Sequence, residues 1–299
     1  MSPRREGVVG GLIRAARPKQ WAKNLLVFAA PAAAGVLDQA EPLADATIAF
    51  GAFCLAASGT YMLNDVADRA ADARHPTKHT RPIAAGIVPP GLATVVGVLA
   101  IATGVALSFA ADWHLAVTVA IYVAVTTAYS YWLKHVVILD VVAVASGFVL
   151  RAIGGATATG VPVSDWFFIV TSFGSLFVVT GKRQGEVGEM AEEEGAAADV
   201  RKTLDEYSDS FLAYLRTISS AVMFMAYCVW AFETAAASAT SVPWFELSIL
   251  PFVIAVLRYA LLLDRGHGAA PEELFFADRP LQLAGLSWAM VYGTAVYLT

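Results

Sequence analysis

The sequence predicts an all-α membrane protein that crosses the bilayer many times, and two observations support this prediction: its composition and its long apolar runs. Hydrophobic residues make up 58% of the 299 residues and charged residues only 15%, whereas about a quarter of a typical soluble domain is charged. The mean hydropathy is +0.61. A net charge of -5 and only two cysteines exclude a nucleic-acid-binding protein and a disulfide-stapled secreted domain. The expected partner is a lipid bilayer, with no nucleic acid.

Nine apolar runs lie along the chain, and each is interpreted as a transmembrane helix because about 20 apolar residues cross the hydrocarbon core. The runs are Asn24–Leu37, Ala46–Leu63, Gly91–Ala111, Leu115–Leu133, Val136–Thr159, Trp166–Thr180, Phe211–Ala237, Trp244–Leu263 and Leu281–Thr299. The first and the sixth are short and need polar neighbours to reach that length. Together the runs predict a single transmembrane domain over residues 1–299, with two long polar loops at about 65–90 and 182–210.

Lys and Arg occur only at alternate connections between the runs, which sets the orientation because cytoplasmic loops carry the positive excess. The start of the chain and both long loops contain several Lys and Arg residues. The opposite connections contain acidic residues and no Lys or Arg: Asp38, Glu41, Asp45, Asp112, Asp165, Glu233 and Glu246. We therefore expect a multi-pass protein of the cell inner (plasma) membrane, with the N terminus and the active site cytoplasmic. The sequence is compatible with a homo-oligomer without requiring one.

The most informative segment is the polar end of the second run, where Asn64, Asp65, Asp68 and Asp72 recur at helical spacing. Residues at such intervals lie on one face of a helix, so the three carboxylates are expected to form an acidic stripe. Carboxylates that repel one another are tolerated where they share a divalent cation, and Mg²⁺ commonly bridges such groups to substrate phosphates. The sequence therefore predicts a Mg²⁺ site. The alternative is a solvated helix end whose acidic residues pair with neighbouring arginines.

A basic loop follows directly and contains His75, Lys78 and Arg81. Acidic groups, a metal ion and basic groups next to one another describe a site for phosphate groups. The alternative interpretation is that these cations only set the membrane topology. The two roles are compatible.

Two motifs in this region resemble those of a known family. The pattern NDxxDxxxD begins at Asn64, and the pattern HPxKxxRPIAAG begins at His75. Together they resemble the UbiA superfamily of intramembrane prenyltransferases, and the resemblance covers nearly the whole chain. It implies a UbiA-like bundle of nine transmembrane helices with cytoplasmic cap loops. It also implies that Asp65, Asp68 and Asp72 bind Mg²⁺ and that Asn64 belongs to the same catalytic group.

Further segments resemble one branch of this superfamily, which transfers the 5-phosphoribosyl group of phosphoribosyl pyrophosphate to decaprenyl (polyprenyl) phosphate in cell-wall arabinan synthesis. These segments are RPKQWAKN from residue 17, YSYWLK from residue 129, LD from residue 139 and FVLRAIGG from residue 148. The resemblance implies an enzyme, a glycosyltransferase. The substrate-binding residues that we assign with it are Lys23, Tyr61, His75, Lys78, Arg81, Tyr129, Lys134, Arg151, Lys182, Arg183 and Glu186.

The end of the sixth run departs from the aromatic prenyltransferases of the superfamily, which carry a second aspartate motif there. Lys182 and Arg183 stand at this place, followed by Glu186. We interpret the two cations as phosphate ligands, and the alternative is an ion pair between Lys182 and Glu186 along one helix face. Arg151 lies deep in the fifth run, where an arginine needs a polar cavity or a partner. A substrate role and an ion pair with a carboxylate on a neighbouring helix are both left open.

Both substrates of the implied reaction are anionic, which favours a site with more cations than carboxylates. Mg²⁺ on the aspartates would make diphosphate a better leaving group. As diphosphate leaves, the anomeric carbon would gain oxocarbenium character. The lipid phosphate would then attack this carbon without a general base. Lys23 and Lys134 are the candidates for the lipid phosphate, with contact to lipid headgroups as the alternative. Two other functions are weighed against this one: transfer of a prenyl group from its diphosphate to an aromatic acceptor, and membrane transport.

Overall fold

A computed structural model describes residues 7–192, 206–238, 241–265, 274 and 277–298. The central part of the predicted loop at 182–210, the N-terminal residues 1–6 and Thr299 lie outside the described residues. The regular elements are α1 (Val8–Ala15), η1 (Pro18–Phe28), α2 (Ala29–Ala33), α3 (Ala40–Ala67), α4 (Arg69–Asp72), η2 (Lys78–Thr80), α5 (Pro90–Ser108), α6 (Trp113–Tyr131), η3 (Leu133–His135), α7 (Leu139–Thr159), α8 (Asp165–Glu192), α9 (Asp209–Ala237), α10 (Trp244–Asp264) and α12 (Arg279–Tyr297).

All regular elements of the described residues are helices, which confirms the predicted all-α class. Six of these helices are long and apolar enough to cross a membrane: α3, α5, α6, α7, α9 and α10. The predicted count of nine spans is therefore not confirmed. The first apolar run folds into the 3-10 helix η1 and the five-residue α2, and α8 continues past its apolar run into the polar residues Lys182, Arg183 and Glu186.

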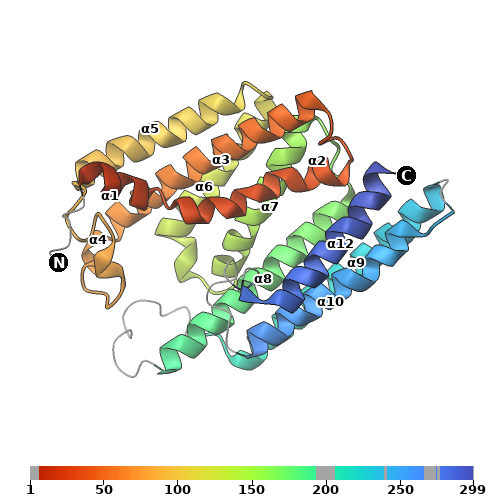
Figure 1. The fold of residues 1–299 in the computed structure, drawn as a ribbon. Coiled ribbons are helices and arrows are strands. Elements are labelled where there is room, and N and C mark those ends of the chain that lie inside the picture. Colours follow the sequence, from red (N-terminus) through yellow and green to blue (C-terminus); the bar gives the residue numbers. More distant parts are fainter. Residues whose placement is uncertain (1–6, 193–205, 239–240, 266–273, 275–276, 299) are drawn as a thin grey trace.

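The helices form two groups along the chain (Figure 1). α3, α5, α6 and α7 pack together on one side, and α8, α9, α10 and α12 pack together on the other, with α7 and α8 in contact between them. The short helices α1 and α4 lie at one end of the bundle, and α12 ends at the opposite end. The polar segments that follow α3 are therefore gathered at the α1 end.

Two close approaches of backbones depend on glycine. A Cβ atom on Gly59 of α3 would lie 2.4 Å from the carbonyl oxygen of Gly97 of α5, and one on Gly155 of α7 would lie 1.7 Å from the carbonyl oxygen of Val27 in η1. Small residues of this kind allow membrane helices to approach closely. The first contact joins the two helices that flank the α4 loop, and the second places η1 directly against α7.

The main apolar core lies where η1, α3, α6 and α7 meet. Its fully buried side chains include Val27, Phe53, Leu115, Val119 and Tyr122, and the rings of Phe53 and Tyr122 meet edge to face with their centroids 5.3 Å apart.

Several helices begin at a side-chain cap: Asp112 accepts from the His114 N–H, Ser208 from the Phe211 N–H and Asp278 from the Leu281 N–H. Capping satisfies backbone donors that would otherwise lack partners at a helix start.

Candidate active site

The predicted acidic stripe is interrupted in the structure. α3 ends at Ala67, Asp68 takes φ -86° and ψ 3°, and α4 covers only Arg69–Asp72. The bend divides the acidic residues into two groups, because Asp65 and Asp72 share one partner while Asp68 contacts others. The expectation of one continuous helical stripe is therefore wrong, since ion pairs with different elements hold the carboxylates in place.

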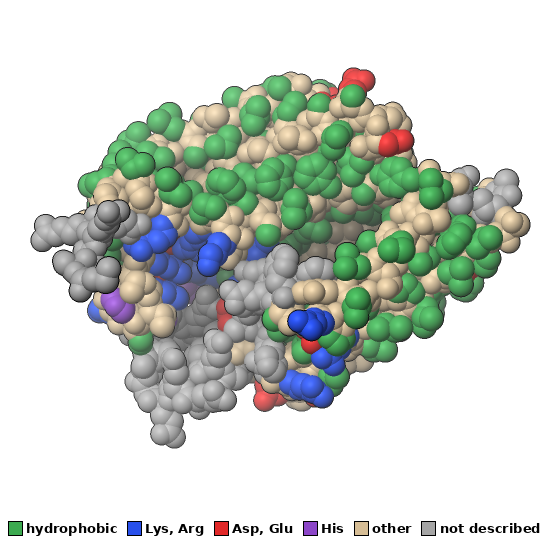
Figure 2. Space-filling view, viewed as in Figure 1, with side chains coloured by type: hydrophobic (Ala, Val, Ile, Leu, Met, Phe, Trp, Pro, Cys, Tyr) green, Lys and Arg blue, Asp and Glu red, His purple; other side chains and the backbone are tan. Residues whose placement is uncertain are grey.

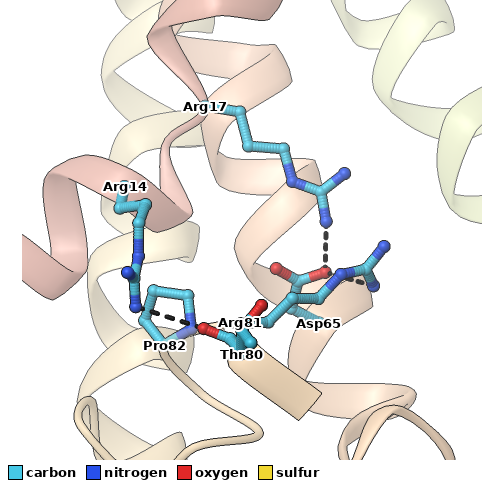
Figure 3. Close-up of a pocket in the computed structure, with 6 residues that line it drawn as sticks. All are labelled: Arg14, Arg17, Asp65, Thr80, Arg81 and Pro82. Carbon is cyan, nitrogen blue, oxygen red and sulfur yellow. Dashed lines mark hydrogen bonds and ion pairs between the residues drawn. The ribbon is translucent and has the colours of Figure 1, made fainter. Parts of the chain in front are cut away.

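Asp65 is the most enclosed of the three carboxylates, with 2% of its side chain exposed. Its Oδ1 atom accepts hydrogen bonds from Arg17 at 2.5 Å and from Arg81 at 3.1 Å. Arg81 also donates to Asp72 Oδ2 at 2.7 Å. Figure 3 shows the two guanidinium groups reaching the Asp65 carboxylate from different elements. The two arginines thus neutralise both buried carboxylates.

Arg17 reaches Asp65 because of its backbone conformation. Its φ of 53° and ψ of 60° are left-handed, which is uncommon for a residue with a side chain. This conformation ends α1 and leads into Pro18, which disfavours a right-handed helical residue before it. The guanidinium lies 4.9 Å from the centre of the Tyr61 ring, at a distance typical of a cation–π contact. Tyr61, which the sequence assigned to substrate binding, therefore lies beside Arg17.

A pocket of about 170 Å³ lies beside this network and is lined by Arg14, Arg17, Asp65, Thr80, Arg81 and Pro82. Arg14 donates to the Thr80 carbonyl oxygen at 3.2 Å (Figure 3). Figure 2 shows Lys and Arg side chains gathered in a hollow near α1 and α4. Three cations and one carboxylate line the pocket, so its charge suits an anionic ligand.

Asp68 faces the opposite way, toward η3. Lys134 Nζ lies 3.1 Å from Asp68 Oδ1, and the Asn64 amide donates to Asp68 Oδ2 at 3.1 Å. The pair joins the loop after α6 to the end of α3, although 66 residues separate the two side chains along the chain. Asn64, Asp68 and Lys134, all predicted site residues, are thus brought together.

A second charged cluster forms around Arg183, which is 5% exposed. Its Nη1 donates to Glu186 at 2.6 Å and its Nη2 donates to the Tyr129 hydroxyl at 3.0 Å. Its Nε lies 3.1 Å from Asp140 Oδ2. This contact is an ion pair and not a hydrogen bond, because the Nε–H does not point at the carboxylate oxygen. Asp140 also accepts a 2.5 Å hydrogen bond from Tyr207. The structure therefore brings together Tyr129, Arg183 and Glu186, three of the residues assigned to substrate binding from the sequence.

The other predicted residues lie in η1, in η2 and the turn before it, and in α8. Lys182 Nζ is 3.9 Å from Glu186 Oε1, as in the alternative ion-pair interpretation. His75 Nδ1 lies 3.3 Å from the Thr77 backbone nitrogen, so its ring stabilises the turn before η2. Lys78 begins η2, and Lys23 lies half-buried in η1.

Arg151 lies apart from both clusters. Its guanidinium donates to Asn24 Oδ1 at 2.6 Å, to the Gly147 carbonyl oxygen at 2.6 Å and to the Tyr122 hydroxyl at 2.9 Å. Within the described residues, no carboxylate is at ion-pair distance from it. The proposed ion pair with a neighbouring carboxylate is therefore wrong, because neutral oxygen atoms of η1, α6 and α7 surround this cation instead.

The described residues contain no group of three His, Cys, Asp or Glu side chains spaced to hold a metal ion by themselves. Mg²⁺ commonly binds proteins through one or two carboxylates and completes its shell with water and substrate phosphates. Asp65 lines the basic pocket and Asp72 shares Arg81 with it, so these two carboxylates offer oxygen donors of this kind on the same side. The residues present therefore fit a Mg²⁺ ion that is bound together with a phosphorylated substrate.

Comparison with known proteins identifies the class. The UbiA prenyltransferase family matches residues 25–284, and the chain belongs to this family. It is 44% identical to the decaprenyl-phosphate phosphoribosyltransferase of Mycolicibacterium smegmatis, over 98% of this chain and 95% of that protein. It is 41% identical to the protein of the same name from Corynebacterium glutamicum, over 98% of this chain and 89% of the relative. The resemblance inferred from the sequence motifs is confirmed.

A solved structure shares the fold. The UbiA homologue from Archaeoglobus fulgidus bound to GPP and Mg²⁺ aligns with a TM-score of 0.68 at 17% identity, over 97% of this chain and all of that one. At this identity the likeness shows the fold alone. The UbiA-like bundle expected from the motifs is thereby confirmed.

Sequence reasoning did not assign roles to Arg14, Arg17, Asp140 or Tyr207. Arg17 was visible in the RPKQWAKN segment, and its position before Pro18 was the available signal. Tyr207 carries no local signal, because its partners are 67 and 69 residues away. Burial and the hydrogen bond to Asp140 raise the pKa of Tyr207 to about 12, so this hydroxyl stays protonated at neutral pH.

Proposed function

We propose that this protein transfers the 5-phosphoribosyl group from phosphoribosyl pyrophosphate to decaprenyl phosphate and releases diphosphate, supplying a precursor for cell-wall arabinan. The observation that carries the proposal is the network in which Arg17, Arg81 and Lys134 neutralise Asp65, Asp72 and Asp68 beside a basic pocket. When an anionic substrate binds together with a cation, the basic side chains of these pairs can bind the substrate and the carboxylates can bind the cation. The 41–44% identity to enzymes named for this reaction supports it.

The donor binds at the Asp65 pocket in this proposal. Asp65, Asp72 and, once it exchanges Lys134 for the ion, Asp68 would hold Mg²⁺, which would supply positive charge that stabilises the departing diphosphate. Arg17 and Arg81 turn from the carboxylates to the phosphate oxygens, where charge-assisted hydrogen bonds are strong and directional. Arg14 adds a third cation to the same pocket. Negative charge that develops on the leaving group is thus met by preorganised cations.

The acceptor approaches from the η3 side. Lys134 contacts Asp68 at the end of α3, and Lys23 lies in η1, which packs against α7. These two lysines bind the lipid phosphate and orient one of its oxygens toward the anomeric carbon. That oxygen is largely ionised at neutral pH, because phosphate monoesters have a second pKa near 6. No side chain needs to remove a proton from the nucleophile.

The long apolar helices place the prenyl chain in the bilayer and the charged clusters at one face of it. We assign this face to the cytoplasm because the Lys and Arg residues of the connections gather on this side, as the positive-inside rule describes. The water-soluble donor is then taken from the cytoplasm of the cell, and the protein resides in the plasma membrane. The whole chain acts as a single transmembrane domain.

The test is a transfer assay with purified protein, radiolabelled phosphoribosyl pyrophosphate and decaprenyl phosphate, with and without Mg²⁺. Label should enter the lipid phase only with Mg²⁺, and Asp68→Asn should abolish the transfer. Asp165→Asn is the matched control, because Asp165 is exposed at the other end of α8. A prenyl group transferred from its diphosphate to an aromatic acid, with no labelled lipid, would instead assign the prenyltransferase function.

A further inference from the structure

The turn between η3 and α7 is strained. Ile138, the residue before α7, has φ 73° and ψ -48°, a region that is rare and strained for any residue with a side chain. A β-branched residue there is a true outlier. Arg17 and Ile138 are the two non-glycine residues with a positive φ in the described part of the chain, and Ile138 is the β-branched one. Strain of this kind persists only where surrounding contacts enforce it, and it concentrates at functional sites.

The contact that enforces the conformation of Ile138 comes from Tyr207, just before α9. The Tyr207 hydroxyl accepts a hydrogen bond from the Ile138 N–H at 2.6 Å and donates one to Asp140 Oδ1 at 2.5 Å. One hydroxyl thus holds both the strained residue and the first turn of α7. Tyr207 is itself fixed, because it is 4% exposed and packs with Val141 and Leu212. Its ring also stacks on Phe211, with centroids 6.0 Å apart.

The strained turn is short and connects directly to Lys134. The Asp140 N–H donates to the Val136 carbonyl at 3.0 Å, and the Val136 N–H donates to the Leu133 carbonyl at 3.1 Å. These hydrogen bonds leave little freedom between Ile138 and η3. A change in the backbone at Ile138 therefore moves Lys134 away from its position 3.1 Å from Asp68.

We propose that Tyr207 is a positioning residue, which holds Ile138 in its strained conformation and thereby sets Lys134 at Asp68 for the lipid phosphate. This inference rests on the proposed function, in which Lys134 binds the acceptor. It also explains why the segment before α9 contacts the start of α7. In this proposal Tyr207 contacts neither substrate, and its effect passes through the η3–α7 turn.

The kinetic test uses Tyr207→Phe, which removes the hydroxyl and keeps the ring packing. We expect KM for decaprenyl phosphate to rise about three- to tenfold, the range for one lost hydrogen bond, while KM for phosphoribosyl pyrophosphate stays unchanged. Tyr227→Phe is the matched control, because that buried hydroxyl pairs with Ser248 and Trp288, far from η3. Equal effects of the two substitutions on both KM values would overturn the inference.

A rescue experiment separates positioning from general stability. Glycine adopts positive φ without strain, so Ile138→Gly no longer needs the tyrosine to hold the turn. The double variant Tyr207→Phe/Ile138→Gly should therefore regain most of the lost affinity for decaprenyl phosphate. Additive losses in the two variants would contradict the proposed coupling.

A measurement without the reaction keeps this inference distinct from the proposed function. In hydrogen exchange of the full chain, Tyr207→Phe should speed deuterium uptake in the segment 133–140, because the Ile138 amide loses its acceptor. Tyr227→Phe should leave this segment unchanged. If the wild-type protein transfers no phosphoribosyl group but Tyr207→Phe still takes up deuterium faster in this segment, the proposed function fails and the role of Tyr207 in holding the turn stands. Unchanged uptake in Tyr207→Phe would overturn that role itself.

Discussion

Two sets of arginine residues in this protein have their charges balanced in different ways. At the end of α3, Arg17 and Arg81 are 28% and 27% exposed and pair with carboxylates. In the interior, Arg151 is 5% exposed and is surrounded by neutral oxygen atoms. Ion pairs that reach solvent can exchange one partner for a ligand, whereas a buried guanidinium with fixed neutral acceptors joins the elements that supply them. The first arrangement suits binding, and the second suits the fold.

The largest effect on activity is expected from the exchangeable set. Asp65→Asn leaves Arg17 and Arg81 without their shared carboxylate and removes a proposed Mg²⁺ ligand. Transfer should fall about 100- to 1000-fold, as when one preorganised electrostatic group of an active site is lost. Initial rates at saturating substrates, compared with Asp165→Asn, test this. A rate equal to that of the control would remove Asp65 from the site.

A substitution of Arg151 in the interior should lower the stability of the protein. Arg151→Leu strands the acceptors on Asn24, Gly147 and Tyr122 and should lower the free energy of unfolding by about 2–4 kcal/mol. Arg151→Lys should not restore it, because one ammonium group cannot replace the guanidinium fork. Thermal unfolding in detergent measures both variants. A stable but inactive Arg151→Leu protein would instead place Arg151 among the substrate ligands.

Arg17 should affect donor binding more than folding. Arg17→Met removes one of two cations on Asp65, while Arg81 still neutralises this carboxylate. We expect KM for phosphoribosyl pyrophosphate to rise about 10- to 100-fold, as for a lost hydrogen bond between charged groups. Kinetics with varied donor concentration give the value, and Lys19→Met serves as a basic control in the same segment. A rise confined to the KM of the lipid would assign Arg17 to the acceptor.

The smallest effect is expected from pH. Burial and the hydrogen bond to Asp140 raise the pKa of Tyr207 to about 12, from an ordinary value of 10.0. The stabilisation that Tyr207 gains as a phenol is therefore complete below about pH 10 and is lost as pH rises from about 10 to about 12. Stability curves of wild type and Tyr207→Phe should converge in this window. Curves that stay parallel there would show that Tyr207 ionises as an exposed tyrosine does.

The sequence was sufficient for the fold class and for the position of the acidic and basic motifs, because apolar runs and helical spacing are local patterns. It was insufficient for the pairing of those motifs. Asp65 is 48 residues from Arg17, and Asp68 is 66 residues from Lys134, so their contacts depend on how η1 and η3 pack. The partners of Arg151 could not be predicted from the sequence either, because its acceptors are an amide, a backbone carbonyl and a phenol, and a charge pattern does not indicate such neutral groups.

The predicted count of nine spans was not confirmed, for a related physical reason. An apolar run shows that a segment avoids water, but it does not show whether that segment forms one long helix. The run at Asn24–Leu37 becomes η1 and α2, whose backbone packs directly on α7 at Gly155. There the apolar character serves contact between elements, as well as contact with lipid.

The close packing of α3 on α5 at Gly59 and Gly97 has a consequence for biosynthesis. These helices are neighbours in the chain, so a protein inserted from its N terminus can complete this pair while residues beyond Ser108 are still on the ribosome. Arg17, Asp65 and Arg81 all lie before that point. The pocket that we assign to the soluble substrate is therefore assembled early in synthesis, whereas the residues that complete the lipid side emerge later.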